Sequence, residues 1–369
     1  TKPLEKLNKE EKDYLLEIGK STWDFFETYL TEENNYLIPD NYQEDRKEKI
    51  VLRTSSTNIG LSLLAVVSAY DLKYINQEKA LKLLGKILNT IDELPKWNGH
   101  LYNWYNIKTK EPLYPRYIST VDSGNLVGYL YVVKEFFNQK RTSPVVDSLV
   151  ERLIENTDFS KLYNYEQQIF SIGFNIEENK LTDSYYDLLA SEARQASLVA
   201  IAKKDVPVRH WRHLSRTLTT LGKYKGLVSW SGTAFEYLMP NINIPKYEGS
   251  LLDESCKFLI KTQIEYSKNI GVPWGISESA FNMKDLKGNY QYKAFGIPWL
   301  GLKRGLADEI VVSSYGSFLA INEKPKEELQ NLKRLEKEGM YGKFGFYEAI
   351  DYTPERVEKG KKSAIVKTY

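Results

Sequence analysis

The sequence predicts an all-α protein, and the alternation of helices with long loops favours an α/α toroid over an irregular helical bundle. Roughly a dozen segments carry the apolar periodicity of a helix. The loops between them are rich in glycine and aromatic residues, and strand-like alternation is scarce and brief. We expect the loops at one end of the toroid to form a substrate cleft.

Three N-terminal segments predict long helices. The first covers about 9–30 and carries an amphipathic apolar stripe. Ser55 or Ser56 precedes TNIGLSLLAVVSAYDL, which is apolar almost all round and is therefore expected to be capped and buried. Asn76 precedes QEKALKLLGKILNTIDEL, whose apolar residues recur at i, i+3 and i+4.

The rest of the chain predicts more helices and one hairpin. Helices are expected over 121–138, 143–156, 184–203, 249–268 and 323–338, and shorter ones near 208–221, 231–238, 299–307 and 313–321. Lys287-Gly288-Asn289 can turn between two polar-aromatic strands at about 282–296. No linker or fixed repeat interrupts the chain, which predicts one catalytic domain over 1–369. The charged start indicates either a domain excised from a larger, membrane-associated chain or a mature cytosolic start.

Charge and composition exclude several partners. Lys and Arg total 51 and Asp and Glu total 49, a balance that argues against nucleic acid, whose phosphates favour a basic face. A neutral polymer such as a glucan suits this balance better. The 27 tyrosines combine an apolar ring with a polar tip, which suits sugar binding and also suits ordinary cores.

Few residues are available for metals or disulfides. Cys256 is the one cysteine, so no intrachain disulfide can form. His210 and His213 could share a helix face but have no acidic third ligand nearby, so we interpret them as surface or structural residues. We expect no metal, no cofactor and no direct membrane insertion by this segment, since no apolar run approaches the length of a span.

The segment 271–305 contains an unusual carboxylate. Glu278 lies among Trp274, Phe281 and several small residues, and its nearest cation in sequence is Lys284. A carboxyl group buried among aromatic rings tends to keep its proton, and a protonated acid is what a glycosidase uses to protonate a leaving oxygen. The alternative is an apolar core loop with one solvated glutamate.

The loop 97–125 combines rings with hydrogen-bonding groups. The rings come from Trp97, Tyr102, Trp104, Tyr105 and Tyr117, and the polar groups from Asn103, Arg116, Asp122 and Asn125. This density predicts a sugar-binding surface. In the alternative interpretation, Asp122 caps the helix that begins near Ser123.

Other acids lie in similar surroundings. In the predicted helix 184–203, Glu192 is the only charge on an apolar stripe; a buried carboxylate needs a partner or a purpose, and the alternative is an ion pair with Arg194 or a distant arginine. Glu236 and Glu348 also lie among aromatic residues and are interpreted as structural or sugar-binding groups. The sequence lacks GxGxxG, GxxxxGK[ST] and GxSxG, which leaves carboxylate chemistry on a neutral polymer.

Eight ordered motifs resemble the central glycoamylase-like domain of cyclic β-1,2-glucan synthases, which is related to endo-β-1,2-glucanases. The resemblance runs from about Val51 to the C-terminus and rests on the following segments: RTSSTNIGLSLLAVVSAYDLKYI, GHLYNWYNIKTKEPLYPRYISTVDSGNLVGYL, DSYYDLLASEARQASLVAIAK, GTAFEYLMP, YEGSLLDES, GVPWGISESAFN, NYQYKAFGIPWLGLKRGLADEIVVSSY and GFYEAIDYTPERV.

The resemblance implies an (α/α)6 barrel that acts on linear β-1,2-glucan, without a cofactor, as a cytoplasmic domain of an inner-membrane-anchored synthase whose other domains are its partners. It implies an anomer-retaining transglycosylase that forms cyclic β-1,2-glucan, with Glu278 as acid/base and Glu192 as nucleophile. A hydrolase that gives shorter linear chains and a non-catalytic glucan-binding domain are the alternatives. In the family the chain continues past KTY into a further helix.

We expect the substrate-binding residues to come from the loops described above. They are Trp104, Tyr105, Arg116, Tyr117, Asp122, Asn125, Arg194, Glu236, Trp274, Phe281, Tyr290, Gln291, Tyr292, Lys293, Phe295, Tyr347 and Glu348.

Overall fold

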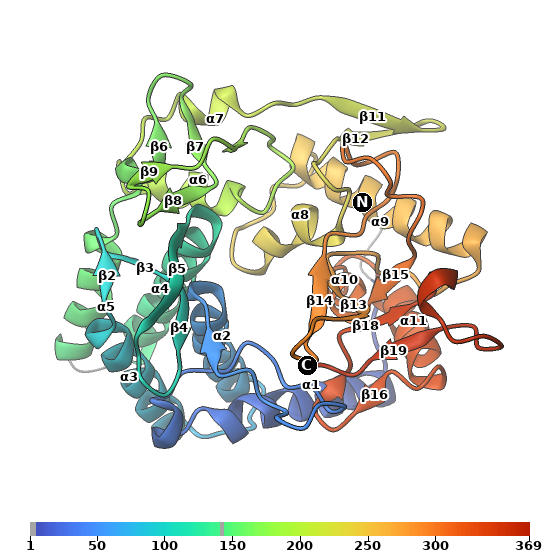
Figure 1. The fold of residues 1–369 in the computed structure, drawn as a ribbon, viewed down its shortest axis with the longest axis horizontal. Helices are drawn as coiled ribbons and strands as arrows, with labels where there is room; N and C mark the ends of the chain where they lie inside the picture. Colours follow the sequence, from blue (N-terminus) through green and yellow to red (C-terminus); the bar gives the residue numbers. More distant parts are fainter. Residues whose placement is uncertain (1–4, 141–143) are drawn as a thin grey trace.

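The computed structural model describes residues 5–140 and 144–369. Residue 143, the first position of the predicted helix 143–156, therefore lies outside the described residues. The chain travels once round the molecule, so that the C-terminal elements return beside the first helix (Figure 1). The helices are α1 (Lys9–Tyr29), α2 (Ser56–Asp71), α3 (Gln77–Glu93), α4 (Thr120–Lys140), α5 (Pro144–Asn156), α6 (Arg194–Ala202), α7 (His210–His213), α8 (Ala234–Leu238), α9 (Leu251–Ile270), α10 (Ser314–Phe318) and α11 (Pro325–Lys337).

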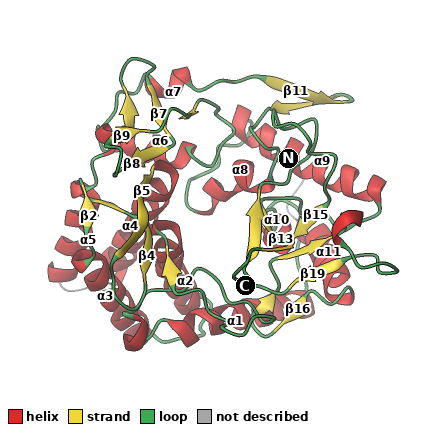
Figure 2. Ribbon diagram, viewed as in Figure 1, coloured by secondary structure: helices red, strands yellow, loops and turns green. Residues whose placement is uncertain are grey.

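The protein is mainly helical, as expected, but short antiparallel strands occupy many of the loops, so it is not built from helices alone (Figure 2). The largest sheet has five strands in the order β1 (Arg53–Thr54), β4 (Asn103–Asn106), β5 (Pro112–Ser119), β8 (Gly173–Asn175) and β9 (Lys180–Leu181). The two three-stranded sheets are β10 (Tyr185–Tyr186), β7 (Ile169–Ser171), β6 (Tyr163–Asn164), and β15 (Val311–Ser313), β18 (Ala349–Asp351), β19 (Ala364–Val366).

Four further strand pairs are hairpins. They are β2 (Lys96–Trp97) with β3 (His100–Leu101), β11 (Leu218–Leu221) with β12 (Tyr224–Leu227), β13 (Ser279–Lys284) with β14 (Tyr290–Lys293), and β16 (Tyr341–Gly342) with β17 (Gly345–Phe346). The pair β13–β14 confirms the hairpin predicted around Lys287-Gly288-Asn289. Short 3₁₀ turns lie at Glu32–Asn34, Phe159–Leu162, Met239–Ile242 and Pro354–Arg356.

The predicted N-caps hold where a hydroxyl or amide side chain meets the first turn. Ser55 forms a capping box with Asn58 at the start of α2, and Asn76 and Ser250 cap α3 and α9. The apolar residues of α2 explain its burial between α1, α3 and α4. Such caps satisfy backbone N–H groups that the helix itself leaves unpaired.

Three helix predictions were wrong in part or entirely. The segment 184–203 begins with β10 and a turn, and its helix starts only at Arg194. The segment 208–221 contains one helical turn, α7, followed by strand β11, and the segment 299–307 forms turns without a helix. In each case tertiary contacts with neighbouring strands outweigh local propensity.

The core has two buried apolar clusters. One lies between α1 and α6 and includes Leu63, Leu84 and Val133, and the other is centred on α8–α11 and includes Leu259, Leu300 and Val312. Helix α4 packs against α2, α5 and α6, whereas α8 packs against α9 and α10. Loops from both halves therefore meet over the middle of the molecule.

Candidate active site

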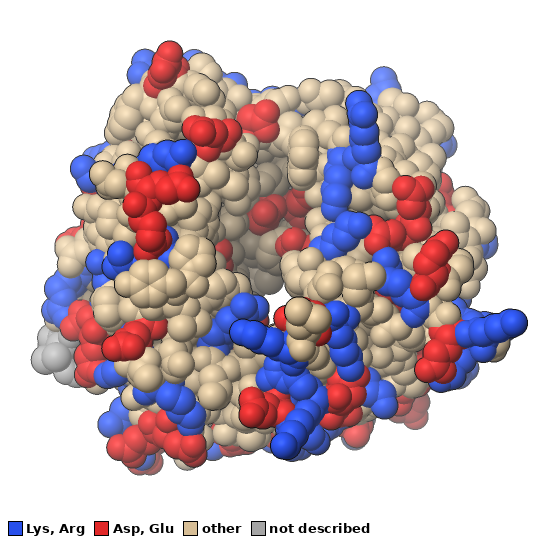
Figure 3. All heavy atoms as spheres, viewed as in Figure 1, with Lys and Arg blue, Asp and Glu red and all other residues tan. Residues whose placement is uncertain are grey.

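The middle of the molecule is hollowed, and acidic side chains line the hollow (Figure 3). The cleft has a volume of about 620 Å³ and is lined by residues from both halves of the chain. Among the residues predicted to act on or bind substrate, those in its wall are Trp104, Asp122, Asn125, Glu192, Glu278, Tyr290, Tyr292 and Glu348. The structure thus brings the two predicted catalytic carboxylates to one cavity.

Glu192 lies in the turn that precedes α6, and it is not on a helix face as the sequence pattern predicted. The turn is closed by local hydrogen bonds: the Ser191 hydroxyl accepts from Ala193 N at 3.2 Å, and the Glu192 carbonyl accepts from Gln195 N at 3.1 Å. A carboxylate on such a turn can project into the cleft while the helix behind it stays in the core.

Arg194 fixes this turn to helix α8. Arg194 is 3% exposed, and its guanidinium donates to the carbonyl oxygens of Ser191 at 2.9 Å and Glu236 at 2.6 Å, and also to that of Tyr237. These three hydrogen bonds go to backbone carbonyls, and the positive charge of Arg194 also opposes the rise in the pKa of Glu192. Arg194 therefore acts as a structural clamp behind the turn that carries Glu192.

Glu278 directly precedes β13, and its backbone is held from α10. The Tyr315 hydroxyl donates to the Glu278 carbonyl at 2.6 Å and lies 3.0 Å from the Ser277 hydroxyl. Two neighbouring aromatic residues, Trp274 and Phe281, are 7% and 6% exposed, so the apolar surroundings inferred from the sequence are present.

The two carboxyl groups have raised pKa values. Burial, followed by the negative charge of Glu236, raises the pKa of Glu192 to about 7. Burial, followed by the charges of Glu192 and Glu236, raises the pKa of Glu278 well above its usual range. Burial and like charges both disfavour ionisation of a carboxyl group. The charge of an ionised Glu192 therefore favours the protonated form of Glu278.

Asp122 belongs to a polar network in the opposite wall. Its carboxylate accepts from the Thr57 hydroxyl at 2.5 Å and from the Asn103 amide at 3.0 Å. The Asn125 amide donates to Thr57 at 3.1 Å, and the Gln195 amide donates to Asn125 at 3.3 Å. This network joins α2, β4, α4 and α6, and it presents oriented polar groups to the cleft.

Asp40 and Arg53 also line the cleft, although the sequence analysis did not single them out. Their side chains form an ion pair at 3.0 Å, and the Arg53 guanidinium lies 4.3 Å from the centre of the Trp104 ring. Asp40, Arg53 and Trp104 could not be grouped from the sequence, because they are far apart along the chain. The ion pair and the cation–π contact together hold the indole in the cleft wall.

Glu348 lies just before β18 and accepts a hydrogen bond from Ala280 N at 2.7 Å. Burial raises the pKa of Glu348 to about 7. Its charge also raises the pKa of Glu278, although burial and the charges of Glu192, Glu236 and Asp122 have larger effects. Glu348 therefore both binds the backbone of β13 and influences the pKa of Glu278.

Glu236 is 8% exposed and does not line the cleft cavity. It closes the capping box of α8 with Thr233, and its carboxylate also accepts from the Ser229 hydroxyl at 2.9 Å and from Ser231 N at 3.0 Å. Burial raises the pKa of this carboxyl group, and the hydrogen bonds oppose the rise.

The other predicted substrate-binding residues lie outside the wall of this cavity. Besides Arg194 and Glu236, they are Tyr105, Arg116, Tyr117, Trp274, Phe281, Gln291, Lys293, Phe295 and Tyr347.

Three of these aromatic residues are core residues. Tyr105 has no exposed surface, and its hydroxyl donates to the Pro95 carbonyl. Phe281 and Phe295 pack edge to face with 5.6 Å between ring centres. Burial of a large ring removes more apolar surface from water than a sugar contact would, which explains why aromatic composition alone did not separate cleft residues from core residues.

The polar members are held by other side chains or lie on an exposed strand. Arg116 pairs with Glu177 at 2.8 Å, and the Tyr347 hydroxyl donates to Glu44 at 2.7 Å. The Tyr117 and Thr182 hydroxyls are 3.2 Å apart. Lys293 pairs with Glu309, and Gln291 is exposed on β14.

The histidine at 210 is structural. His210 has no exposed surface, one ring nitrogen lies 2.8 Å from the Ser197 hydroxyl and the other lies 3.1 Å from the Gln168 carbonyl. No group of three or more His, Cys, Asp or Glu side chains within residues 5–140 and 144–369 has an arrangement that could hold a metal. None of the described helices combines the length and hydropathy required to cross a membrane.

The chain is similar to known proteins both in sequence and in structure. The Glycoamylase family model, described as "Putative glucoamylase", matches residues 184–369. The cyclic β-(1,2)-glucan synthase NdvB of Rhizobium meliloti (strain 1021) is 34% identical to this chain, over 95% of the chain and 17% of that protein. The chain thus spans under a fifth of the length of this curated relative.

Two solved structures share the fold at low identity. One, a glucoamylase-type protein of Bacteroides fragilis NCTC 9343, has a TM-score of 0.79 at 18% identity and covers 100% of this chain and 90% of its own. The other is an endo-β-1,2-glucanase of Chitinophaga pinensis in complex with sophorotriose and glucose. Its TM-score is 0.77 at 15% identity, with 98% of this chain and 90% of its own covered.

Proposed function

This chain belongs to the Glycoamylase family, and we propose that it is an anomer-retaining transglycosylase that converts linear β-1,2-glucan into cyclic β-1,2-glucan. The substrate class is supported by the identity to a cyclic β-(1,2)-glucan synthase. The observation that carries the reaction is that Glu192 and Glu278 line one cleft, where the charge of Glu192 raises the carboxyl pKa of Glu278. Two interacting carboxyl groups are the working parts of a retaining glycosidase.

In the first step, the Glu192 carboxylate attacks the anomeric carbon while Glu278 donates its proton to the leaving glucosyl oxygen. The glycosidic bond breaks, and a glucosyl-enzyme ester forms. In the second step, Glu278 removes a proton from the incoming hydroxyl as that oxygen displaces Glu192. Two displacements at one carbon retain the anomeric configuration.

The acceptor decides the product. If the hydroxyl comes from the non-reducing end of the same glucan, the product is a ring, and if it comes from water, the product is a shorter linear chain. We propose that the Arg53–Trp104 platform and the Asp122 network hold the glucan acceptor in place. A bound acceptor has a large entropic advantage over water. The endo-β-1,2-glucanase neighbour supports hydrolysis as the second candidate, through its fold alone.

We also propose that the helical alternation builds an (α/α)6 barrel and that residues 1–369 act as one catalytic domain within a larger synthase. The packing of α4 between α2 and α6, with α3 against α2 and α5 against both α3 and α4, supports this arrangement. The other domains of such a synthase would be the partners of this one, and its location would follow from theirs.

Mass spectrometry of the products from linear β-1,2-glucan tests the reaction. We expect rings, each lighter by one water than the linear glucan of the same length. Shorter linear chains would establish the hydrolase instead, and an unchanged glucan would leave only binding.

Glu278→Gln and Glu192→Gln should each remove nearly all turnover. Glu328→Gln is the matched control, because Glu328 is another buried acid but does not line the cleft.

A further inference from the structure

The loop between α9 and β13, which ends at Glu278, is held along its backbone by two amide side chains. Asn331 of α11 accepts from Trp274 N at 3.0 Å and donates to the Trp274 carbonyl at 2.7 Å. Gln263 of α9 pairs with Ile276 in the same way, accepting from its N–H at 2.9 Å and donating to its carbonyl at 2.7 Å. Each amide takes the place of a strand partner for one residue. The loop is therefore fixed to two helices before it reaches the acid.

The first turn of α8 is attached to the same loop. Phe235 N donates to the Ser277 hydroxyl at 3.0 Å, and Ala234 N donates to the Ile276 carbonyl at 3.3 Å. Both N–H groups lie in the first turn of the helix, where the helix itself supplies no acceptor. The acid loop thus provides acceptors for the start of α8, so a shift of one requires a shift of the other.

The later residues of α8 are attached to the turn that carries Glu192. The carbonyl oxygens of Glu236 and Tyr237 accept from the Arg194 guanidinium, which also holds the Ser191 carbonyl. Helix α8 has five residues, so it is only about 7.5 Å long at 1.5 Å per residue. One short helix therefore connects the acid loop with the turn of the proposed nucleophile.

The electrostatics agree with this position of α8. Burial has the largest effect on the pKa of both Glu192 and Glu278. The charge of Glu236, in the middle of α8, comes next for Glu192, and after the charge of Glu192 it also raises the pKa of Glu278. Coulomb interactions weaken with distance and with screening, so a charge that acts on both carboxyl groups lies close to both.

Tyr315 of α10 holds the acid loop from another side. Its hydroxyl donates to the Glu278 carbonyl at 2.6 Å and lies 3.0 Å from the Ser277 hydroxyl, and its ring packs edge to face against Phe235. Burial, followed by the charge of Glu278, raises the pKa of Tyr315 well above its usual range, so the hydroxyl keeps the proton that it donates. Since that proton is used on the carbonyl, the Ser277 hydroxyl donates to the Tyr315 oxygen while it accepts from Phe235 N.

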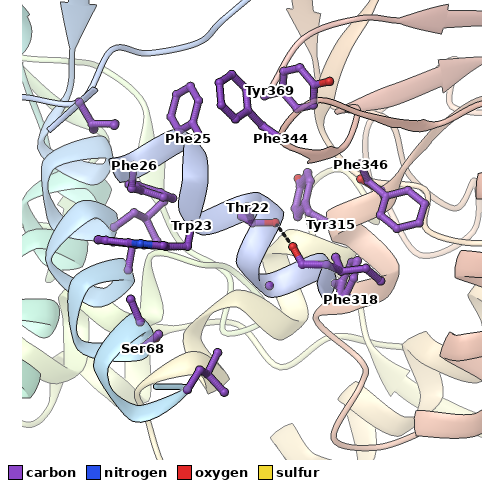
Figure 4. A pocket seen from close by; sticks show the side chains of 18 of the residues that line it. Thr22, Trp23, Phe25, Phe26, Ser68, Tyr315, Phe318, Phe344, Phe346 and Tyr369 are labelled. Carbon is purple, nitrogen blue, oxygen red and sulfur yellow. Dashed lines mark hydrogen bonds between the residues drawn. The ribbon is translucent and has the colours of Figure 1, made fainter. Parts of the chain in front are cut away.

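The ring of Tyr315 also borders a second cavity, which has a volume of about 860 Å³ and is walled by α1, α2 and α10 (Figure 4). A smaller side chain at this position would enlarge the cavity and lower stability for a reason unrelated to the acid. Tyr315→Phe keeps the ring and removes only the hydroxyl, so it is the informative variant.

We propose that α8 fixes the separation of the Glu192 and Glu278 carboxyl groups, with Ser277 and Tyr315 as the positioning residues on the acid side. The inference rests on the proposed function, in which retention requires carboxyl groups roughly 5–5.5 Å apart. Misplacement of a reacting group by about 1 Å costs on the order of 100-fold in rate. Loss of either hydroxyl should therefore slow proton transfer by Glu278 without weakening the binding of glucan.

Two substrates separate a misplaced acid from general damage to the site. Linear β-1,2-glucan needs a proton on its leaving oxygen, whereas a dinitrophenyl β-glycoside of the same glucan releases a stable dinitrophenolate anion without one. Azide is added in the second assay as the acceptor. It attacks the anomeric carbon of the glucosyl-enzyme and displaces the Glu192 carboxylate, and it has no proton for Glu278 to remove.

The variants are Ser277→Ala and Tyr315→Phe, and Ser255→Ala in α9 is the matched control. Ser255 and Ser277 are 1% and 0% exposed, and the Ser255 hydroxyl likewise accepts from a backbone N–H, that of Leu227, at 3.1 Å. The control thus removes a hydroxyl of the same kind at a site that does not hold the acid loop. Glu278→Gln is measured beside them as the reference for loss of the acid itself.

We expect Ser277→Ala and Tyr315→Phe to lower kcat on linear glucan by about tenfold or more, with KM within about twofold of the wild type. Both should keep at least about half of the wild-type rate on the dinitrophenyl glycoside with azide, and Ser255→Ala should match the wild type on both substrates.

Equal losses on the two substrates, or no loss on either, would overturn the inference. If Glu278→Gln loses turnover of linear glucan while both hydroxyl variants keep it, only the positioning role fails. Full turnover of linear glucan by Glu278→Gln would overturn the proposed reaction, and this inference with it.

Discussion

The acidic residues around the cleft act on Glu278, and their negative charges favour its protonated form. Glu278 is affected, after burial, by Glu192, Glu236, Asp122 and Glu348 in that order. In the proposed reaction Glu278 must be protonated and Glu192 ionised at the start. The dependence of kcat/KM on pH should then be bell-shaped, with an acid limb from Glu192 and an alkaline limb from Glu278.

Glu348→Gln should move the alkaline limb of this profile to lower pH. The substitution removes a negative charge near Glu278, which makes ionisation of Glu278 easier and lowers its pKa. The amide can no longer ionise but keeps an oxygen that can accept from Ala280 N. The measurement is kcat/KM on linear β-1,2-glucan from pH 5 to 10, and Glu166→Gln, on an exposed turn, is the control. An alkaline limb that stays in place would show that Glu348 does not influence the acid.

At this scale the sequence predicted the surroundings of single residues better than their position. Glu278 stands out because it is an acid among rings without a near cation, and the structure retains those surroundings. Asp40 and Arg53 could not be found in this way, because their relation to Trp104 exists only after the strands pair. The aromatic loops likewise mixed cleft residues such as Trp104 with core residues such as Tyr105.

Among the elements, the turn before α6 matters most for the proposed chemistry. Its sequence has helical periodicity, yet β10 pairs with β7 and only the residues from Arg194 onward form the helix. The buried guanidinium, bonded to three carbonyl oxygens from two elements, stabilises this departure from a continuous helix. A single sequence cannot reveal such a contact, because two of its three acceptors lie 42 and 43 residues downstream.

Arg194→Met should therefore destabilise the protein and displace the turn that carries Glu192. It leaves buried carbonyl oxygens without donors, at about 1–3 kcal/mol each. We expect a loss of several kcal/mol, on the order of 3–5, in the free energy of unfolding by urea. Arg194→Lys keeps the charge but loses the planar guanidinium, so its free energy of unfolding should lie between those of Arg194→Met and the wild type. If Arg194→Met were as stable as the wild type, the clamp described above would be incorrect.

The N-caps provide a second test, because Ser55 lies at both a helix start and the cleft wall. Ser55→Ala removes the acceptor for Asn58 N and should lower the free energy of unfolding by about 1 kcal/mol. It should also raise the KM for glucan, since Thr57 and Asn58 beside it line the cleft. Asn76→Ala at the start of α3 is the matched control: a similar loss of stability is expected there without the change in KM.

For the whole molecule, the sequence predicted the long helices, their alternation and the hairpin β13–β14, but not the other sheets between the helices. The five-stranded sheet joins segments from Arg53 to Leu181 through strands as short as two residues. Such strands carry too few residues for alternation to be recognised, and their pairing depends on the helices that position them. The cleft arises from these pairings, which is why its acids were identified individually but not as one wall.

Buried acids also make the stability of the whole protein depend on pH. Glu328 in α11 has no exposed surface; one carboxyl oxygen accepts from the Ser317 hydroxyl at 3.0 Å, and the other has no partner among the described residues. Burial raises the pKa of Glu328 to about 8, and the hydrogen bond from Ser317 opposes the rise. The folded protein therefore keeps a proton on this group that the unfolded chain releases at a pKa of about 4.3.

The sign follows from proton binding. Between pH of about 4.3 and 8, the folded state binds more protons than the unfolded state, so the free energy of unfolding falls as pH rises. One group contributes at most about 1.4 kcal/mol per pH unit to this fall. Glu328→Gln cannot titrate, so it should flatten the decline in urea midpoints measured from pH 5 to 8. The exposed Glu10→Gln should keep the wild-type slope, and an unchanged slope in Glu328→Gln would mean that Glu328 is ionised in the folded protein.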